Sequence, residues 1–334
     1  MGIKKIYFDN RWIGSHGIGR FSKMLSLHIP MIKMNILGSP TSIFDPILFS
    51  IQALFLPSDA IVFSPGFNAP IFIRQKFIFT LHDLNHIDRS ENSSFLKSLY
   101  YKFVILRAIK FSYKVLTVSE FSKNRIVTWS NANPNKIINV GNGVDEFFTS
   151  NNLVRIIESR YFLCVSNRKL HKNEFRLIKA FSLANIDNDI CLVFTGFVTT
   201  EVKIFCNSIG ILDRIIFLGI IPDSDFPALY SGSLGLLFPS LYEGFGLPVI
   251  EAMACGTPVL TSNISSLPEV AGNAALLVNP HSIDDIRFGI ERLVNDAEFR
   301  ASLSALGLER SKLFRWDRVA SKVAEALGCN SNEI

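Results

Sequence analysis

Residues 236–258 read LLFPSLYEGFGLPVIEAMACGTP and contain an apolar strand, a loop with two glycines and a helix, in that order. Pro248 suits the first helical position, where its missing N–H loses no partner, and Gly256 suits the helix end. The glycines let the loop backbone approach a ligand, and the helix start offers unpaired amides and a positive dipole end. This combination favours a bound diphosphate. The residues predicted to hold it are Gly244, Phe245, Gly246 and Leu247.

The same alternation of strand and helix runs through the rest of the chain. Apolar strands are expected at residues 5–8, 60–64, 77–81, 114–118 and 137–140, and again at 161–165, 191–195, 214–218, 235–238, 258–261 and 275–278. Buried apolar strands separated by helices are typical of parallel sheets covered on both faces. The 334 residues exceed what one core usually serves. The sequence predicts an α/β protein with two Rossmann-like, doubly wound domains that face each other across a cleft.

Local composition suggests where the domains begin and end. The polar run Ser150-Asn151-Asn152 precedes a new helix and strand, so a hinge is expected near residues 148–158. An N-terminal domain would then span residues 1–155, and a C-terminal domain residues 156–312. Residues 313–334 contain Phe314-Arg315-Trp316-Asp317, and the stretch from there to Leu327 has the spacing of an amphipathic helix.

Charge divides the chain unevenly. Residues 1–155 contain 18 Lys and Arg against 9 Asp and Glu, whereas residues 156–334 contain 16 against 20. Residues 95–115 place five cations among aromatic and aliphatic side chains, with no acidic residue. One interpretation is a core helix with solvated lysines, and the other is a helix that docks on an anionic membrane surface. Nucleic acid is not an expected partner, because no recognisable nucleic-acid-binding motif accompanies the basic segment.

The sequence also predicts a location. No apolar run approaches the ~18 residues of a membrane span, and the N-terminus lacks the features of a signal peptide. The expected location is the cytoplasm, peripheral on the inner face of the membrane. The five cysteines contain no C-x-x-C pair, so no structural zinc is expected.

Two carboxylates flank the predicted anion site. Glu251 is expected in the first turn of the helix, where the dipole alone would favour an acid, and Glu243 lies at the loop entrance. The Glu-x7-Glu pattern, followed by EAMACGTPV, resembles the retaining glycosyltransferases with the GT-B fold, family 4 or glycosyl transferases group 1. The resemblance implies transfer of a sugar from a nucleotide sugar with its anomeric configuration retained. It places Glu243 near the donor sugar and Glu251 on the ribose hydroxyls. It also implies that residues 1–155 bind the acceptor, that residues 156–312 bind the nucleotide sugar, and that the helix in residues 313–334 crosses back onto the N-terminal domain.

The segment Val165-Ser166-Asn167-Arg168-Lys169-Leu170-His171-Lys172-Asn173 is similar to the basic pair that binds the donor diphosphate in that family. By this resemblance Arg168 and Lys172 would stabilise the departing diphosphate, a task that an Arg fork and an ammonium can perform without a metal. Two surface cations at helical spacing are the alternative. A glycine common before the Arg in the family is replaced here by Ser166-Asn167.

The first half resembles the family only in short pieces. Gly17 and Gly19, after the first strand, look like the glycine loop that closes over the donor phosphates, with a simple turn as the alternative. His82 closes a strand and looks like the family's His near the donor sugar and reaction centre, with a structural histidine as the alternative. Asp223-Ser224-Asp225 imitates a manganese-binding Asp-x-Asp but reads as loop and cap residues. Neither a metal nor another cofactor is expected.

The sequence GIGRF at residues 17–21 is similar to bacterial enzymes that use GDP-mannose or related GDP-sugars. The resemblance favours a mannosyltransferase-like enzyme with a GDP-sugar donor and a glycan or lipid-linked acceptor, in surface polysaccharide synthesis. No motif reads the base, so UDP and ADP stay open. Two alternatives remain: a nucleotide-sugar 2-epimerase of the same architecture, and a catalytically silent subunit of a polysaccharide assembly complex.

Overall fold

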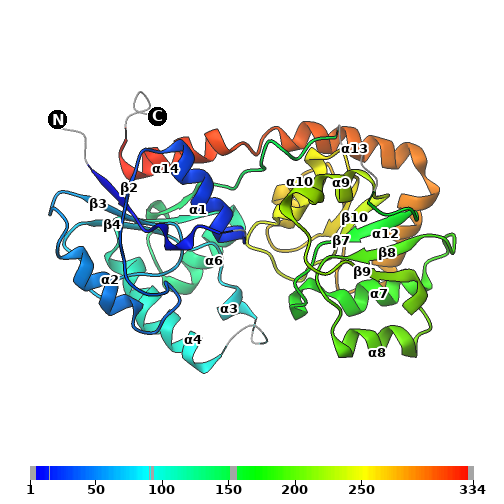
Figure 1. Cartoon of the computed structure of the whole chain (residues 1–334), viewed down its shortest axis with the longest axis horizontal. Helices are drawn as coiled ribbons and strands as arrows, with labels where there is room; N and C mark the ends of the chain where they lie inside the picture. Colours follow the sequence, from blue (N-terminus) through cyan, green and yellow to red (C-terminus); the bar gives the residue numbers. More distant parts are fainter. Residues whose placement is uncertain (1–4, 15, 90, 92–93, 151–155, 330–334) are drawn as a thin grey trace. The chain divides into compact units, whose positions relative to one another are not determined.

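The computed structural model describes residues 5–14, 16–89, 91, 94–150 and 156–329. The chain forms two compact units (Figure 1). Unit 1 comprises residues up to Gly143 together with those from Arg315 onward, and unit 2 comprises Val144–Phe314.

Unit 1 is built on a six-stranded parallel sheet of order β2-β1-β3-β4-β5-β6. The strands are β1 (Ile6–Phe8), β2 (Ile32–Lys33), β3 (Ile61–Ser64), β4 (Lys76–Thr80), β5 (Lys114–Thr117) and β6 (Ile137–Asn139). The sequence analysis missed only β2, a two-residue edge strand with both residues exposed and therefore no apolar pattern. Every other predicted strand of this unit is present within a residue or two of its expected ends.

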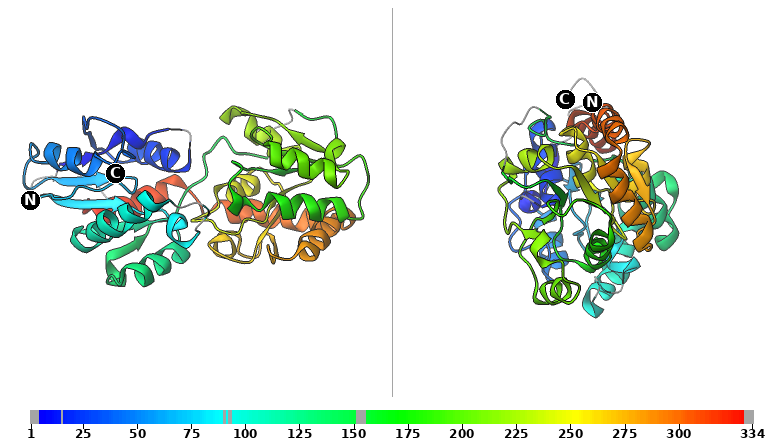
Figure 2. Two further views of the ribbon diagram at one scale, coloured as in Figure 1. Left: turned by 90° about the horizontal axis from the view of Figure 1, so that it is seen from below. Right: turned by 90° about the vertical axis from the view of Figure 1, so that its right-hand side faces the viewer.

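The helices of unit 1 cover both faces of its sheet (Figure 2). They are α1 (Gly17–His28), α2 (Asp45–Ala53), α3 (Asn85–Asp88), α4 (Phe95–Tyr100), α5 (Leu106–Phe111), α6 (Glu120–Ser130) and α14 (Trp316–Leu327). The short helical segments η1 (Asn10–Trp12), η3 (Tyr101–Ile105) and η4 (Pro134–Lys136) complete the unit. A core of Phe49, Val62, Phe79, Ile105 and Val115 fills the space between sheet and helices.

Unit 2 repeats this architecture with the strand order β12-β11-β10-β7-β8-β9. The strands are β7 (Tyr161–Cys164), β8 (Cys191–Phe194), β9 (Ile215–Phe217), β10 (Gly235–Phe238), β11 (Val259–Ser262) and β12 (Leu276–Val278). The strand order reverses between the neighbours β7 and β10. Ligands of doubly wound sheets bind at such a switch point, beyond the carboxyl ends of the strands.

The helices of unit 2 are α7 (Glu174–Leu183), α8 (Thr200–Ser208), α9 (Phe226–Ser231), α10 (Leu247–Ala254), α11 (Leu267–Ala271), α12 (Ile283–Asn295) and α13 (Ala297–Ser311). Three short turns, η5 (Leu170–Lys172), η6 (Leu212–Arg214) and η7 (Asp223–Asp225), join them to the strands. Phe162, Leu177, Phe181, Leu237 and Ile290 belong to the core of the unit. Together the two sheets confirm the predicted α/β class and two doubly wound domains.

The boundary between the two units lies after Gly143, earlier in the chain than the predicted boundary after residue 155. Val144 N–H donates to the carbonyl of Phe314 at 2.9 Å, and the Phe148 and Tyr230 rings lie 6.0 Å apart, so the residues after Gly143 pack on unit 2. Residues 151–155 of the predicted hinge lie outside the described part. Phe314 also belongs to unit 2, because its ring packs on Phe245 at 5.7 Å.

The last helix returns to unit 1. Helix α14, red in Figure 1, packs beside α1, and the Trp316 ring lies 6.3 Å from that of Phe21. Gly143 belongs to this contact, because a Cβ there would lie 2.5 Å from the Trp316 ring. The amphipathic spacing after Phe314 therefore buries its apolar side against unit 1.

The basic segment 95–115 is helical from Phe95 to Phe111, and its last four residues leave the helix. It runs through α4, a π-helical turn η3 and α5, and the helix ends at Phe111. Ser112 is extended and Tyr113 N–H donates to the carbonyl of Phe77, so the chain has already entered the sheet before Lys114. Tyr101, Ile105 and Ile109 are buried, as the core-helix interpretation requires. Phe95, Phe103 and Phe111 are instead exposed beside the cations.

Candidate functional site

In unit 2, two loops at the switch point bring Lys172 and Glu243 together. Lys172 Nζ donates to Glu243 Oε1 at 2.7 Å, and the exposed fractions of the two side chains are only 12% and 14%. The ammonium also lies 4.6 Å from the centre of the Phe238 ring. The pair joins residues 71 positions apart at the carboxyl ends of neighbouring strands.

Buried hydrogen bonds fix the two loops against each other. Leu241 N–H donates to the carbonyl of His171 at 2.7 Å. Asn173, buried and in the left-handed conformation with φ 63°, donates from Nδ2 to the carbonyls of Pro239 at 3.0 Å and Pro280 at 2.7 Å. These bonds hold the loop that carries Lys172 against the loop that carries Glu243. Sequence reasoning missed Asn173, although an Asn immediately before a helix is a familiar positional signal.

The loop between β10 and α10 has the geometry expected for an anion site. Gly246 precedes the helix with φ 106°, a conformation that favours glycine. No side chain caps the start of α10. Ser266 Oγ lies 2.9 Å from the carbonyl oxygens of both Glu243 and Phe245, and its single hydrogen ties the hydroxyl to this loop backbone. Pro248 has no N–H, and Val249 N–H donates to the carbonyl of Gly246 at 3.0 Å, so the anion-binding role predicted for residues 244–247 stays a prediction.

Glu251 lies deeper in the helix than expected. Helix α10 begins at Leu247, so Glu251 is in its second turn and not in the first. The prediction was wrong because Pro248 occupies the second helical position and not the first. The carboxylate is 6% exposed and accepts a hydrogen bond from the Tyr230 hydroxyl at 2.8 Å. Its position therefore has no explanation in the helix dipole.

Arg168 is held by protein groups. Its Nε donates to the carbonyl of Phe197 at 2.9 Å, its Nη1 pairs with Glu174 at 2.8 Å, and its Nη2 donates to the carbonyls of Thr195 and Gly196. These four partners use most of the guanidinium donors. The buried Ser166 donates from Oγ to the same Glu174. This arrangement ties the loop after β7 to the loop after β8, so the diphosphate role predicted for Arg168 stays a prediction.

In unit 1, Gly17 and Gly19 lie inside the first turn of α1 and not in a loop before it. His16 caps this helix, because its Nδ1 accepts from Gly19 N–H at 2.9 Å. A Cβ on Gly19 would lie 2.6 Å from the carbonyl oxygen of Gly14. Close backbone packing therefore accounts for Gly19 without a ligand, and its phosphate role stays a prediction.

His82 follows β4 and is half-buried. Its Nε2 lies 2.9 Å from the carbonyl of Pro65, and its ring meets that of Phe21 edge-on at 5.0 Å. Burial lowers the pKa of His82 from 6.5 to about 4, a change that the bond to Pro65 only partly opposes. The imidazole is neutral at physiological pH, which suits a hydrogen-bonding role toward a sugar hydroxyl.

This pKa predicts a pH dependence of stability. The folded-state pKa of His82 lies below the unfolded value, so the unfolded chain binds more protons as the pH falls from 6.5 toward about 4. The wild type should therefore lose stability across this window, and His82→Gln should lose less. Urea midpoints followed by tryptophan emission measure this, because Trp12, Trp129 and Trp316 all lie in unit 1. Parallel curves of stability against pH for wild type and His82→Gln would contradict this prediction. His281→Gln serves as the control, because His281 is an exposed histidine of unit 2.

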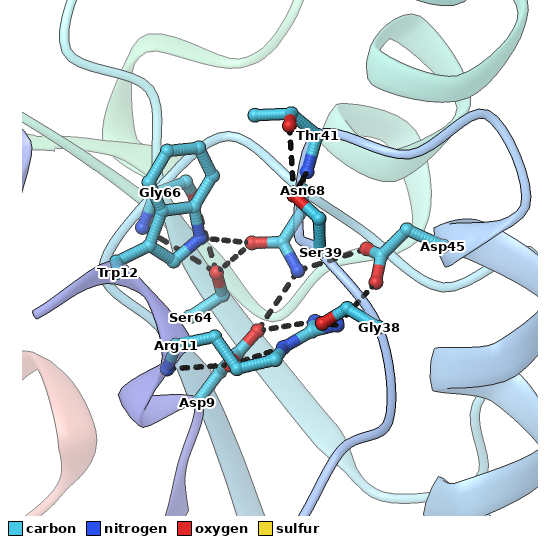
Figure 3. A network of polar contacts seen from close by, with 10 residues as sticks. All are labelled: Asp9, Arg11, Trp12, Gly38, Ser39, Thr41, Asp45, Ser64, Gly66 and Asn68. Carbon is cyan, nitrogen blue, oxygen red and sulfur yellow. Dashed lines mark hydrogen bonds and ion pairs between the residues drawn. The ribbon is translucent and has the colours of Figure 1, made fainter.

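A polar network that the sequence analysis missed lies beyond the carboxyl ends of β1 and β3 (Figure 3). Arg11 donates to Asp9 at 2.7 Å and to Asp45 at 2.6 Å, and both carboxylates are buried. Asn68 Nδ2 donates to the same two residues at 2.9 and 3.0 Å. The Trp12 indole donates to Asn68 Oδ1, and Gly66 leaves room for its ring. Asp9 and Arg11 directly follow the strand predicted at residues 5–8. Their charges at this position were the signal from which the network could have been predicted.

Across the described residues, no group of three or more His, Cys, Asp or Glu side chains is arranged to hold a metal ion. Asp223 and Asp225 form the short turn η7, and Ser224 Oγ donates to Asp225 at 3.0 Å. This agrees with their interpretation as turn residues.

Two doubly wound parallel sheets, with the loop and helix start of α10 at the switch point of the second, define the GT-B fold of glycosyltransferases. The structure of Anabaena Alr3699/HepE, in complex with UDP and glucose, aligns over 98% of this chain and all of that one, with a TM-score of 0.78 and 16% identity. Residues 149–310 match the family Glycosyl transferases group 1. The chain therefore carries a glycosyltransferase domain of this family, as the sequence resemblance indicated.

Curated relatives extend the similarity in sequence. O-antigen chain mannosyltransferase B of Escherichia coli is 28% identical over 282 residues, covering 80% of this chain and 74% of that protein. The serotype-specific mannosyltransferase WbdA of Escherichia coli is 31% identical over 228 residues, 63% of this chain. The match spans only 28% of WbdA, less than a third of its length.

Proposed function

We propose that the chain is a retaining glycosyltransferase that moves a hexosyl group from a nucleotide sugar bound to unit 2. The observation that carries the proposal is the pair of Lys172 and Glu243 at the switch point, fixed beside the uncapped start of α10. A cation and helix amides at one place suit a diphosphate. A carboxylate at the same place suits the hydroxyls of the attached sugar.

The proposed reaction breaks the bond between the anomeric carbon and the diphosphate oxygen, and forms a bond from that carbon to the acceptor oxygen. Lys172 and the α10 amides would stabilise the negative charge that grows on the leaving diphosphate. Glu243 is already paired with Lys172, so no nucleophilic role is assigned to it. Retention would follow from attack on the same face as the leaving group, with the diphosphate oxygen accepting the proton of the acceptor hydroxyl. We propose that no metal or other cofactor takes part.

Mannose, or a related sugar from a GDP-sugar, is the proposed group, and a glycan or lipid-linked acceptor of bacterial surface polysaccharide is the proposed partner. The support is the two relatives, whose names describe O-antigen and serotype-specific mannosyltransferases. The structure of Alr3699/HepE contains UDP and glucose, so a UDP-sugar is the competing donor.

The first experiment is thermal unfolding of the protein with GDP, UDP, ADP and CDP, each with and without EDTA. A ligand that binds the folded state raises its apparent stability. A shift with GDP alone that survives EDTA is the expected result, and a shift with UDP alone would overturn the GDP assignment. Absence of any shift would favour a silent subunit. Product analysis with the selected donor and no acceptor then tests for a 2-epimerase, which would change the sugar without transferring it.

Glu251 supplies a further prediction. Glu251→Gln keeps the shape of the side chain but removes the charge that would bind the ribose hydroxyls. Because a hydrogen bond to a charged group is worth about 1.5–3 kcal/mol, nucleotide affinity should fall roughly 10- to 100-fold. Titration calorimetry with the nucleoside diphosphate measures this. Glu298→Gln, in the first turn of α13, is the matched control. Equal affinity in both variants would remove Glu251 from the nucleotide site.

We also propose that the enzyme works in the cytoplasm, peripheral on the inner face of the membrane. None of the helices in the described ranges is long and apolar enough to cross a bilayer. The support is the basic segment 95–115, whose Lys97, Lys102, Arg107 and Lys110 are exposed alongside Phe95, Phe103 and Phe111. Exposed aromatics beside cations are typical of segments that lie on an anionic membrane surface.

A further inference from the structure

An open pocket of about 550 Å³ lies at the amino ends of β4 and β6, the opposite edge of the unit 1 sheet from His82. We call it the amino-edge pocket. Its lining includes three cations, Arg74, Lys76 and Lys136, the aromatic rings of Phe111 and Tyr113, and the amide side chain of Asn133, but no acidic residue. Neither the predicted donor site nor the proposed reaction uses any of these groups.

The three cations have no carboxylate partner within the described part of the chain. Arg74 donates to the carbonyl of Leu54 at 3.1 Å, Lys136 donates to the carbonyl of Lys110 at 2.8 Å, and Lys76 lies 4.5 Å from the Tyr113 ring centre. The residues that line the pocket come from the stretches 60–82, 92–119 and 121–144, and each of these stretches is free of Asp and Glu. Burial lowers the pKa of Lys136, so a bound anion would relieve an unfavourable environment. The pocket is thus built for negative charge.

Exposed apolar side chains lie on α2 and on the loop that precedes Arg74. Ile47, Ile51 and Phe55 follow one another at four-residue spacing along and just beyond α2, with 48%, 45% and 85% of their surfaces exposed. Ile71 and Phe72 are exposed as well, and their amides donate to Ser50 of α2. Large exposed apolar patches usually mark an interaction site.

Hydrogen bonds join this apolar surface to the basic one. Arg74 reaches the carbonyl of Leu54 at the end of α2, and Arg107 of α5 donates to the carbonyl of Ile71 at 3.0 Å. Helix α2, the 71–72 loop, α5 and the amino-edge pocket therefore form one continuous face. A second copy of the chain would bring the same unneutralised cations against themselves, whereas an anionic bilayer offers both acyl chains and negative charge.

We propose that this face docks on an anionic phospholipid bilayer and that the amino-edge pocket receives the phosphate of a lipid headgroup. The inference rests on the membrane location proposed for the transferase and not on its donor chemistry. The proposed headgroup site is separate from the proposed site of sugar transfer. The apolar side chains of α2 would enter the interface while Arg74, Lys76 and Lys136 hold the phosphate.

The test is flotation of the full chain with vesicles of phosphatidylcholine alone or mixed with phosphatidylglycerol. The wild type should bind only the mixed vesicles. Each cation near an anionic surface is worth about fivefold in binding, so Arg74→Gln, Lys76→Gln and Lys136→Gln together should weaken it roughly 100-fold. The control replaces three exposed lysines elsewhere, Lys23→Gln, Lys203→Gln and Lys322→Gln, and should bind like the wild type. Equal binding by both triple variants would overturn the proposal.

Two readouts separate the possible failures. The thermal shift with the selected nucleotide should be unchanged in the pocket variant, which shows that it is folded and that donor binding is independent of lipid. Soluble sn-glycerol 3-phosphate should neither stabilise the wild type nor displace it from vesicles. If glycerol phosphate does stabilise the wild type but not the pocket variant, the ligand is a free phosphorylated molecule, and the lipid assignment is wrong.

Burial of the α2 face is tested with Phe55→Trp. The emission of this variant should shift to the blue with mixed vesicles and stay unchanged with phosphatidylcholine alone. Phe197→Trp, an exposed position of unit 2, is the control and should not respond. No shift at position 55 in vesicle-bound protein would show that α2 does not enter the interface.

Discussion

Replacing Lys172 by alanine should lower kcat by about 100- to 1000-fold, the usual effect of removing one donor that stabilises charge in a transition state. Negative charge grows on the diphosphate as the sugar bond breaks, so the ammonium contributes more to the transition state than to binding of the bare nucleotide. The affinity for the nucleoside diphosphate should therefore fall much less than kcat. Steady-state kinetics and titration calorimetry on the same preparation measure the two effects.

The variant also leaves Glu243 without its cation, and an unpaired carboxylate could repel the donor by itself. The double variant Lys172→Ala/Glu243→Gln separates the two causes. If Lys172 acts on the diphosphate, the double variant stays slow. Recovery of kcat in the double variant would show instead that Lys172 only neutralises Glu243. Lys169→Ala is the matched control, because Lys169 is exposed and close in sequence.

Replacing Arg11 by methionine should lower the free energy of unfolding of unit 1 by about 3–5 kcal/mol, as expected when one partner of a buried ion pair is removed. Arg11 neutralises Asp9 and Asp45, which are 0% and 1% exposed. Without Arg11, only Asn68 would donate to both carboxylates in the network of Figure 3. Burial already raises the pKa of Asp45, which shows how poorly this site solvates its charge.

Urea unfolding followed by tryptophan emission measures this effect, since all three tryptophans report on unit 1. Arg315→Met is the control, because its pair with Asp317 is largely exposed, and its effect should stay below about 1 kcal/mol. The triple variant Asp9→Asn/Arg11→Met/Asp45→Asn should recover much of the loss, because no unpaired charge remains. Equal destabilisation by Arg11→Met and Arg315→Met would show that the network contributes no more than a surface pair.

Much of the fold could be predicted from the sequence, because its signals are local. Apolar strands such as residues 161–164 and 235–238 can be predicted from their composition. Their regular alternation with helices implies parallel sheets. The loop and helix at residues 243–254 could also be predicted, because the backbone preferences of Gly244, Gly246 and Pro248 follow from residue type. The glycosyltransferase domain was recognisable for the same reason.

The site was less predictable, because its contacts join distant parts of the chain. The sequence could nominate Lys172 and Glu243 separately, but their ion pair depends on β7 and β10 being neighbours. The sequence predicted that Arg168 binds the diphosphate. In the folded chain its guanidinium instead donates to the carbonyls of residues 195–197. The sequence placed the change of domain after residue 155, whereas Phe148 packs on Tyr230 and so belongs to unit 2.

The sequence by itself thus determined most of the strands and helices and the backbone of the loop between β10 and α10, since these depend on neighbours a few residues apart. Only the tertiary structure decided which charges are paired. Asp9, Arg11, Asp45 and Asn68 span 59 positions, and a buried charge is tolerated only where folding supplies its partners. The amino-edge pocket arises in the same way, because three stretches without acids become one surface only when β4, α5 and η4 come together.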